Sequence, residues 1–346
     1  MLTQANIVQA THEERDNANP PIQIPLQKHG KNRFNIYCKD LLCNLMVEIE
    51  DGSIQLTFTS PPYYDQREYT KLKDKDQEKP PLGKEKTVKE YIDNLRKIFL
   101  EVYRVTKFRG SVFVNISDTY SCDKNNYVPE LFCIMMSQIG FHKVNTIPWV
   151  KTNNRTRGTE DRRLLPSWEY LFHFVKKEAA KSDLPQEQKY LYKPFLYYPE
   201  DKKIKVKEIG SRRNKDGTKT EPKIIVSKAY KRLQDFFDKK RYFDIIETAA
   251  AGADSAFLNK QYNAEHEAPF PLQLSLYAIH TCSEIGDKTL DCFMGSGTFA
   301  VASMLFDREA YGYECEERHH NLCIRRCTDI ETGLEELEKE PRAKRA

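Results

Sequence analysis

The sequence lacks long hydrophobic runs, because no apolar stretch in its 346 residues approaches the roughly 20 residues that span a bilayer. Residues 1–30 are polar and lack the apolar core of a secretory signal. A disulfide framework is also not expected, since the nine cysteines are odd in number and scattered, which is typical of reduced thiols. We therefore expect a soluble, intracellular protein with no membrane partner.

The chain has little net charge, since 55 basic residues stand against 51 acidic ones and leave +4. The distribution is uneven, however, because residues 176–232 contain 17 Lys or Arg and 8 Asp or Glu, a local net charge of +9. Phe and Tyr side chains are interleaved with these basic residues between Tyr190 and Tyr230. Such a mixture suits contact with phosphates and bases, although a solvated, Lys-rich insert is the alternative.

Short β-rich runs alternate with segments of helical spacing along most of the chain. We predict strands at 34–38, 54–59, 111–116, 141–149, 170–175, 288–293 and 310–314, and helices at 87–105, 128–139, 271–281, 298–306 and 317–328. This alternation is typical of an α/β fold with a mostly parallel central sheet and helices on both faces. The length fits one large domain that carries an insert.

A glycine turn lies between a predicted strand and a predicted helix, in the segment Asp291-Cys292-Phe293-Met294-Gly295-Ser296-Gly297-Thr298. Such turns bring backbone close to a ligand. Glu314 ends the next strand, 19 residues after Gly295, near the spacing at which an acidic side chain meets ribose hydroxyls. Together these features predict a nucleoside-cofactor site. Gly295-x-Gly297-x-x-Ala300 also matches the dinucleotide fingerprint, so a nicotinamide or flavin cofactor stays open, as does an ordinary tight turn.

The segment Ser60-Pro61-Pro62-Tyr63 also follows a predicted strand, at the edge where open α/β sheets bind ligands. Two prolines make the segment rigid, which would fix the Ser60 hydroxyl and the Pro61 carbonyl as two acceptors facing one point. An exocyclic base amine is a poor nucleophile because its lone pair is delocalised, and two acceptors could direct that lone pair at an electrophile. The Tyr63 ring could stack on a base turned out of its duplex. By itself the segment could equally be a loop or a polyproline piece.

Together, these motifs resemble those of the S-adenosylmethionine-dependent amino-methyltransferases of DNA. The similarity is to the permuted, or beta, group, in which the catalytic motif precedes the cofactor motif. Further similar segments are Arg104-Val105, Asn115 to Tyr120, Trp149 to Asn153 with Arg162, Glu169 and Tyr170 downstream, and His266 to Pro271. The resemblance covers about residues 34–176 and 264–328, and leaves the basic stretch where this group carries its target-recognition region.

The resemblance implies a Rossmann-like methyltransferase fold and a direct, in-line methyl transfer from S-adenosyl-L-methionine to a flipped-out base. The serine-type catalytic motif is Ser60, Pro61, Pro62 and Tyr63. The cofactor would be bound by Asp40, Phe270, Asp291, Phe293, Gly295, Gly297, Thr298 and Glu314. DNA contacts are expected from Arg67, Arg155, Arg157, Arg162, Arg163, Arg212 and Arg213. Cys292 and Phe299 depart from the usual Pro and a common Thr of the family.

This interpretation divides the chain into five parts. They are a polar N-terminal arm (1–32), a catalytic half (33–176), a target-recognition insert (177–263), a cofactor-binding half (264–330) and a flexible tail (331–346). The substrate would be double-stranded DNA, either protected beside a cognate restriction endonuclease or marked for regulation. The chain would act as a monomer or homodimer. In a prokaryote it would lie in the cytoplasm, associated with the nucleoid, and in a eukaryote it would lie in the nucleus.

The target base is predicted from the first motif residue. Relatives with Ser there generally methylate cytosine, so the resemblance favours cytosine N4, with adenine N6 as the alternative. Methylation at carbon 5 needs a Cys nucleophile, which the Pro-Pro-Tyr loop lacks. A nicotinamide-dependent oxidoreductase and a catalytically silent DNA-binding protein are the alternatives from other classes. A zinc site is set aside because four ligands on one helix cannot converge on one ion, here Cys315, His319, Cys323 and Cys327.

Overall fold

The computed structural model describes residues 33–65, 80–121, 124–152, 166–176, 203–205, 212–213, 219–220, 223–225, 245–248 and 270–339. The chain divides into two units, Met1–Lys31 and Asn32–Ala346, and all described residues belong to the second. Five of the arginines expected to contact DNA lie outside the described residues, namely Arg67, Arg155, Arg157, Arg162 and Arg163. None of the described helices is long and apolar enough to cross a membrane.

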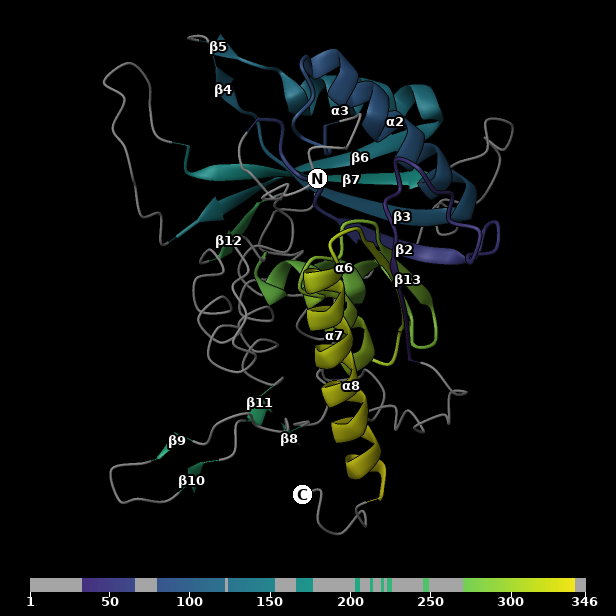
Figure 1. Cartoon of the computed structure of the whole chain (residues 1–346), viewed down its shortest axis with the longest axis vertical. Coiled ribbons are helices and arrows are strands. Elements are labelled where there is room, and N and C mark those ends of the chain that lie inside the picture. Colours follow the sequence, from purple (N-terminus) through teal and green to yellow (C-terminus); the bar gives the residue numbers. More distant parts are fainter. Residues whose placement is uncertain are drawn as a thin grey trace, which may run out of the picture. The chain divides into compact units, whose positions relative to one another are not determined.

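Eight strands form one sheet in the order β1-β14-β13-β2-β3-β7-β6-β12 (Figure 1). Their bounds are β1 Phe34–Cys38, β2 Ile54–Thr59, β3 Thr106–Ile116, β6 Phe141–Lys151, β7 Trp168–Lys176, β12 Ile246–Thr248, β13 Lys288–Asp291 and β14 Glu309–Glu314. Strand β7 is antiparallel to both of its neighbours, β3 and β6, whereas all other neighbouring pairs are parallel. The carboxyl ends of the other strands of this sheet therefore share one edge, at which β7 begins.

Helices cover both faces of the sheet (Figure 1). Helices α2 (Val88–Val105) and α3 (Val128–Ile139) pack on one face, and α6 (Leu272–Cys282), α7 (Thr298–Leu305) and α8 (Glu317–Lys339) on the other. Alternate residues of β3 supply the two cores, because Val112 and Val114 join the α2–α3 core while Phe113 joins the α6–α7 core. The arrangement confirms the predicted α/β fold with a mostly parallel sheet.

Three further pairs of short antiparallel strands lie outside the main sheet. They are β4 (Tyr120–Ser121) with β5 (Lys124–Asn125), β8 (Lys203–Lys205) with β11 (Lys223–Ile225), and β9 (Arg212–Arg213) with β10 (Lys219–Thr220). The second and third of these pairs fall in the predicted insert. Arg212 and Arg213, expected to contact DNA, thus form β9, but their side chains are outside the described part of the chain.

Several predicted boundaries are correct, and the differences have physical causes. Helix α3 has its predicted bounds, and α2 follows Thr87, whose hydroxyl accepts a hydrogen bond from the Glu90 N–H at 3.2 Å. The tail prediction is wrong for residues 331–339, because α8 continues to Lys339 and buries Leu334 in the core. Strand β12 was not predicted; three residues are too short a run to show a period.

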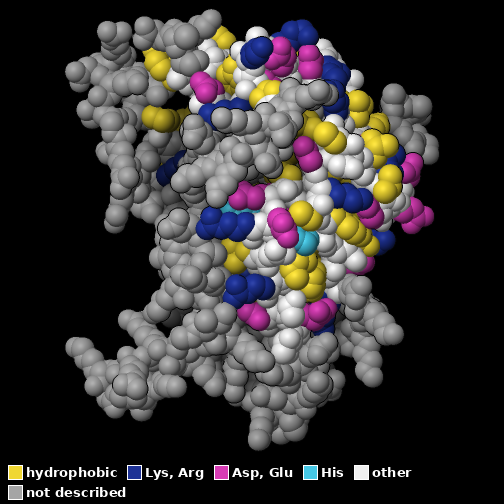
Figure 2. Space-filling model, viewed as in Figure 1, with side chains coloured by type: hydrophobic (Ala, Val, Ile, Leu, Met, Phe, Trp, Pro, Cys, Tyr) yellow, Lys and Arg dark blue, Asp and Glu magenta, His cyan; other side chains and the backbone are white. Residues whose placement is uncertain are grey.

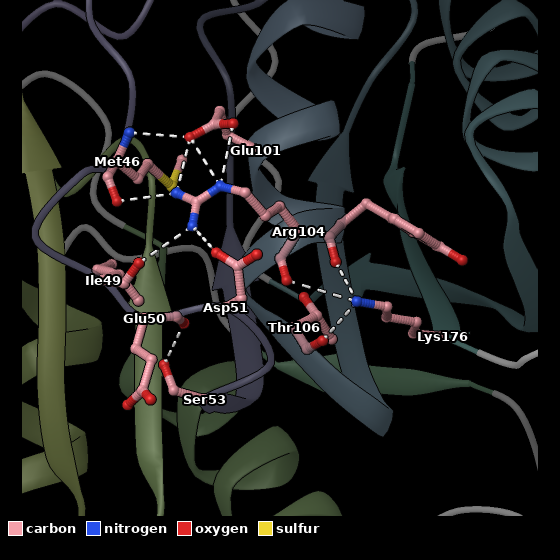
Figure 3. Close-up of polar contacts among 10 residues, drawn as sticks. Met46, Ile49, Glu50, Asp51, Ser53, Glu101, Arg104, Thr106 and Lys176 are labelled. Carbon is pink, nitrogen blue, oxygen red and sulfur yellow. Dashed lines mark hydrogen bonds and ion pairs between the residues drawn. The ribbon is translucent and has the colours of Figure 1, made fainter.

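Arg104, near the end of α2, attaches the segment that leads into β2. Its guanidinium donates to the carbonyl oxygens of Met46 (2.9 Å) and Ile49 (3.2 Å), and also pairs with Asp51 and Glu101 (Figure 3). Glu101 in turn accepts a hydrogen bond from the Met46 N–H at 3.0 Å. This cluster fixes where β2 starts, and so where its carboxyl end lies.

Candidate active site

The two predicted functional loops meet at the carboxyl edge of the sheet. Strands β2 and β13 are parallel neighbours, so the loops that follow them leave the sheet side by side. The Thr59 hydroxyl, at the end of β2, donates a hydrogen bond of 2.6 Å to Asp291 Oδ1, at the end of β13. These residues are 232 positions apart and both fully buried. The Ser60 loop and the glycine turn therefore lie next to one another.

Asp291 is only half satisfied by the protein. Its Oδ1 accepts hydrogen bonds from Thr59 and from the Phe293 N–H at 3.0 Å, whereas Oδ2 is buried and has no partner among the described residues. Burial raises the pKa of Asp291 to about 7, against these two hydrogen bonds, which favour the ionised form. A buried, unpartnered carboxyl oxygen beside a glycine turn is the kind of group that a ligand can satisfy.

The turn after Asp291 requires its glycines. Gly295 and Gly297 have φ angles of 52° and 81°, in the left-handed region that other residues rarely adopt. A Cβ atom at Gly297 would lie 2.4 Å from Cys323 Sγ, so α7, which starts at Thr298, packs against α8 without space for a side chain. The first N–H groups of α7 have no partner within the helix, as at every helix start.

Glu314 links the glycine turn to the outer strands. Its Oε2 accepts a hydrogen bond from the Gly295 N–H at 2.8 Å, and its Oε1 one from the Glu316 N–H at 2.8 Å. The Lys39 N–H bonds the Glu314 carbonyl at 2.9 Å, which brings the exposed Asp40 next to it. Asp40, Glu314 and Asp291 thus follow one another along the same edge.

Aromatic residues near the turn pack into both cores, with Phe58, Phe270 and Phe299 on the α6–α7 side and Phe293 on the α2–α3 side. The Phe270 ring lies 5.0 Å from that of Phe58, which stacks on Phe299 at 5.5 Å. Phe299, which departs from the family's common Thr, is therefore accommodated by the core. Phe293 is half-buried, and Cys292, in place of the usual Pro, is buried.

The Ser-Pro-Pro-Tyr segment is held at its carboxyl end. The Pro62 carbonyl accepts a hydrogen bond from the Tyr91 hydroxyl at 2.8 Å, while among the described residues the Ser60 hydroxyl has no hydrogen-bond partner. Tyr63, whose ring is expected to stack on a base, is 9% exposed and borders the α2–α3 core, and its hydroxyl donates to Glu169 Oε2 at 2.7 Å. The Ser60 hydroxyl, at the start of the segment, is therefore available to a ligand, whereas hydrogen bonds at Pro62 and Tyr63 fix the end of the segment.

Several polar residues at this edge had no role assigned from the sequence, although Lys151 and Glu169 lie in segments that resemble the family. These residues are Thr59, Lys151 and Glu169. Thr59 ends a predicted strand, Lys151 closely follows one, and Glu169 lies just before one. A polar residue at a strand end was the available signal, but it does not show which strands are neighbours. Of the zinc candidates, Cys323 and Cys327 are buried in the core, and no metal-ligand cluster occurs among the described residues.

Charges of both signs are interspersed on the face of the molecule drawn in Figure 2. The described residues of that face show no large patch of one sign. The basic and aromatic stretch from 176 to 232 lies mostly outside the described residues. Its role in DNA binding stays a prediction.

The fold and the edge site together define a methyltransferase-type α/β protein, and sequence comparison gives the family. The model of the family described as DNA methylase, of the N6/N4 group, matches residues 54–325. The chain therefore belongs to the DNA methylase family.

Two relatives illustrate the similarity. The type II methyltransferase M.Cfr9I of Citrobacter freundii is 23% identical over 339 residues, which cover 90% of this chain and 92% of that protein. The type II methyltransferase M.SfiI of Streptomyces fimbriatus is 31% identical over 178 residues, 46% of this chain. The matched part spans only 40% of the length of M.SfiI.

Solved structures show the same fold. The PvuII DNA methyltransferase (cytosine-N4-specific) has a TM-score of 0.57 at 17% identity, over 87% of this chain and 92% of that one. The DNA modification methylase TTHA0409 of Thermus thermophilus, solved with S-adenosyl-L-methionine, has a TM-score of 0.51 at 20% identity, over 86% and 94%.

Proposed function

We propose that the chain is a DNA methyltransferase that transfers a methyl group from S-adenosyl-L-methionine to the N4 amine of cytosine, with adenine N6 as the alternative. The hydrogen bond between Thr59 and Asp291 carries this proposal, because it joins the catalytic loop to the cofactor loop. Transfer would be direct and in line, to a base flipped out of double-stranded DNA.

The residues of the glycine turn fit S-adenosyl-L-methionine, which supplies an electrophilic methyl group when bound. Asp291 offers a buried, unpartnered oxygen, and the start of α7 at Thr298 offers N–H groups to an anionic group. Glu314 would accept hydrogen bonds from ribose hydroxyls, with Asp40 beside it. Gly295 and Gly297 let the backbone approach, while Phe270 and Phe293 would form apolar walls.

The target amine would be held by the Ser60 hydroxyl and the Pro61 carbonyl, and Tyr63 would stack on the base. Because the Pro62 carbonyl already accepts a hydrogen bond from Tyr91, it is not the acceptor for the amine. No residue forms a covalent bond with the base in this scheme, so the contribution of the protein is orientation and electrostatics.

The choice of cytosine N4 rests on Ser60 and on the resemblance to the serine-type, permuted group. The chain order supports that grouping, since the Ser60 motif precedes the Gly295 turn although both lie at one edge. The structurally similar PvuII DNA methyltransferase is cytosine-N4-specific. The type II relatives support a place beside a cognate restriction endonuclease.

The test is to incubate the protein with methyl-labelled S-adenosyl-L-methionine and unmodified DNA, and to digest the product to nucleosides. We expect label in N4-methylcytosine, and a loss of about 100-fold or more in the variant S60A. The matched control is S53A, because among the described residues the Ser53 hydroxyl bonds only the Glu50 carbonyl, in a turn before β2.

Label in N6-methyladenine would select the alternative base, and no label on DNA of varied sequence would overturn the proposal. Calorimetry separates the other classes, because only the methyltransferase should bind S-adenosylhomocysteine in preference to nicotinamide dinucleotides. A catalytically silent DNA-binding protein would transfer no methyl group, and its DNA binding would be the same in S60A as in the unaltered chain.

A further inference from the structure

A second set of polar side chains lies at the carboxyl edge, beyond the catalytic loop. It consists of Asn115 near the end of β3, Lys151 at the end of β6 and Glu169 near the start of β7. Because β7 runs antiparallel between β3 and β6, its first residues lie at the edge where those strands end. None of the three residues is among those proposed to bind the cofactor.

Two of these side chains, Asn115 and Glu169, converge on the hydroxyl group of Tyr63. That hydroxyl lies 2.7 Å from Glu169 Oε2 and 3.2 Å from Asn115 Oδ1. The Asn115 amide donates to Glu169 Oε2 at 3.2 Å and to the Tyr170 carbonyl at 3.1 Å, which fixes the orientation of the amide. Two neighbouring strands, β3 and β7, thus contribute to one anchor point.

The charge of Glu169 is balanced within the cluster. Lys151 Nζ contacts the other carboxylate oxygen, Oε1, and lies 5.2 Å from the centre of the Trp149 ring. The side chains of Lys151 and Glu169 are only 23% and 13% exposed, so their pairing is weakly screened by water. A hydrogen bond from a tyrosine hydroxyl to such a carboxylate is stronger than one between neutral groups.

The anchor completes the fixation of the loop. Tyr91 holds the Pro62 carbonyl, and the Asp65 N–H donates to the Gly83 carbonyl at 2.8 Å, so the backbone is fixed on both sides of Tyr63. A tyrosine side chain has two rotatable bonds before its ring. With the backbone and the hydroxyl both held, the plane of the Tyr63 ring is determined.

We propose that Glu169, held by Lys151 and Asn115, is a positioning residue that sets the plane of the Tyr63 ring on which the target base stacks. The inference rests on the proposed function and deepens it. Its consequence is that losing the anchor lowers the rate of methyl transfer and leaves cofactor binding intact. Misplacement of a stacked base by about 1 Å can lower a rate about 100-fold.

The experiment measures kcat and KM for the full-length chain and the variants E169A, E169Q, Y63F and E169A/Y63F. We expect kcat to fall about 10- to 100-fold in E169A and in Y63F, and the KM for S-adenosyl-L-methionine to stay within about 2-fold. The double variant should be no slower than the slower single variant, because both changes remove one interaction. E169Q should retain part of the rate, since its amide oxygen can accept from Tyr63.

The control is Y311F, because the Tyr311 hydroxyl bonds a carboxylate in the same way, Glu309 Oε1 at 2.8 Å, with Lys288 Nζ 5.5 Å from its ring. It should leave kcat unchanged. The stoichiometry of S-adenosylhomocysteine binding by calorimetry counts folded molecules, so each kcat refers to intact sites even where a variant folds less well.

Unchanged kcat in E169A, or losses that multiply in the double variant, would overturn this inference while the wild-type activity upheld the proposed function. A rise in the KM for the cofactor without a change in kcat would also overturn it. No methyl transfer by the unaltered chain would overturn the proposed function, and the inference with it.

Discussion

At the scale of single residues, Asp291 combines two roles that conflict. It joins two loops through Thr59 and Phe293, yet one of its oxygens is buried without a described partner. Burying a carboxylate in this way destabilises the ligand-free protein at neutral pH. The conflict is what we expect of a residue whose second oxygen serves a ligand.

The pH dependence of stability tests this interpretation. The pKa of Asp291 is 3.8 without the protein environment and about 7 in the folded chain. Between these values the folded state binds more protons than the unfolded state, so stability from this group falls as pH rises, and the loss is complete above about pH 7. The variant D291N lacks this pH-dependent contribution to stability, because an amide does not titrate in this range.

Thermal and urea unfolding of ligand-free wild type and D291N should therefore diverge with pH. Relative to D291N, the wild type should lose on the order of 4 kcal/mol between about pH 4 and about pH 8. Other titrating groups are common to both proteins and cancel in the difference. Parallel stability curves for the two proteins would show that Asp291 keeps an ordinary pKa.

At the scale of elements, the carboxyl end of α2 is tied to β7 by one lysine. Lys176 Nζ donates to the carbonyl oxygens of Tyr103 at 2.6 Å and Thr106 at 2.9 Å (Figure 3). Its ammonium group also lies 4.5 Å from the centre of the Tyr103 ring. The last carbonyls of a helix lack partners within the helix, so a cation from a neighbouring strand stabilises both.

The variant K176M should lower the free energy of unfolding by about 1 to 3 kcal/mol, because several carbonyl groups lose a charged donor. K89M is the matched control, since Lys89 forms an exposed ion pair with Asp93 on the same helix. That pair should contribute little to stability, because water and salt screen an exposed ion pair. Urea unfolding of both variants gives the comparison, and equal effects would contradict the capping role.

At the scale of the whole molecule, the site is assembled along a single sheet edge. From β1 to β7 the edge presents Asp40, Glu314, Asp291, Ser60 and Glu169 in the order of the strands. The groups proposed to bind the cofactor therefore lie on one side of Ser60 and the Tyr63 anchor on the other. A substrate base placed at Ser60 would face both.

DNA affinity is the property of the whole chain that the basic stretch should control. We expect apparent affinity for duplex DNA to fall at least about 10-fold between about 50 and 200 mM salt, because phosphate neutralisation releases counterions. The variant R212E/R213E should show a shallower salt dependence. The control variant K86E/K97E makes the same change of charge at two exposed positions, Lys97 in α2 and Lys86 just before that helix. It should leave the salt dependence of DNA binding unchanged. A flat response of the unaltered chain would contradict the assignment of this stretch.

The sequence by itself determined the order of strands and helices and the two motifs. Periodicity reports local structure, and rigid or glycine-rich turns are visible as Ser60-Pro61-Pro62 and Gly295 to Gly297. Helix α3 was therefore predicted to the residue, whereas β12 and the last turns of α8 depend on contacts with distant residues and were not.

Only the tertiary structure decided which strands are neighbours, and with them which residues share a site. The bond from Thr59 to Asp291 exists because β2 lies beside β13, and the anchor from Tyr63 to Glu169 because β7 runs antiparallel. Pairing between strands is a long-range choice made by packing of the whole sheet. The spacing of residues along the chain reports local structure, and therefore does not predict which strands pair.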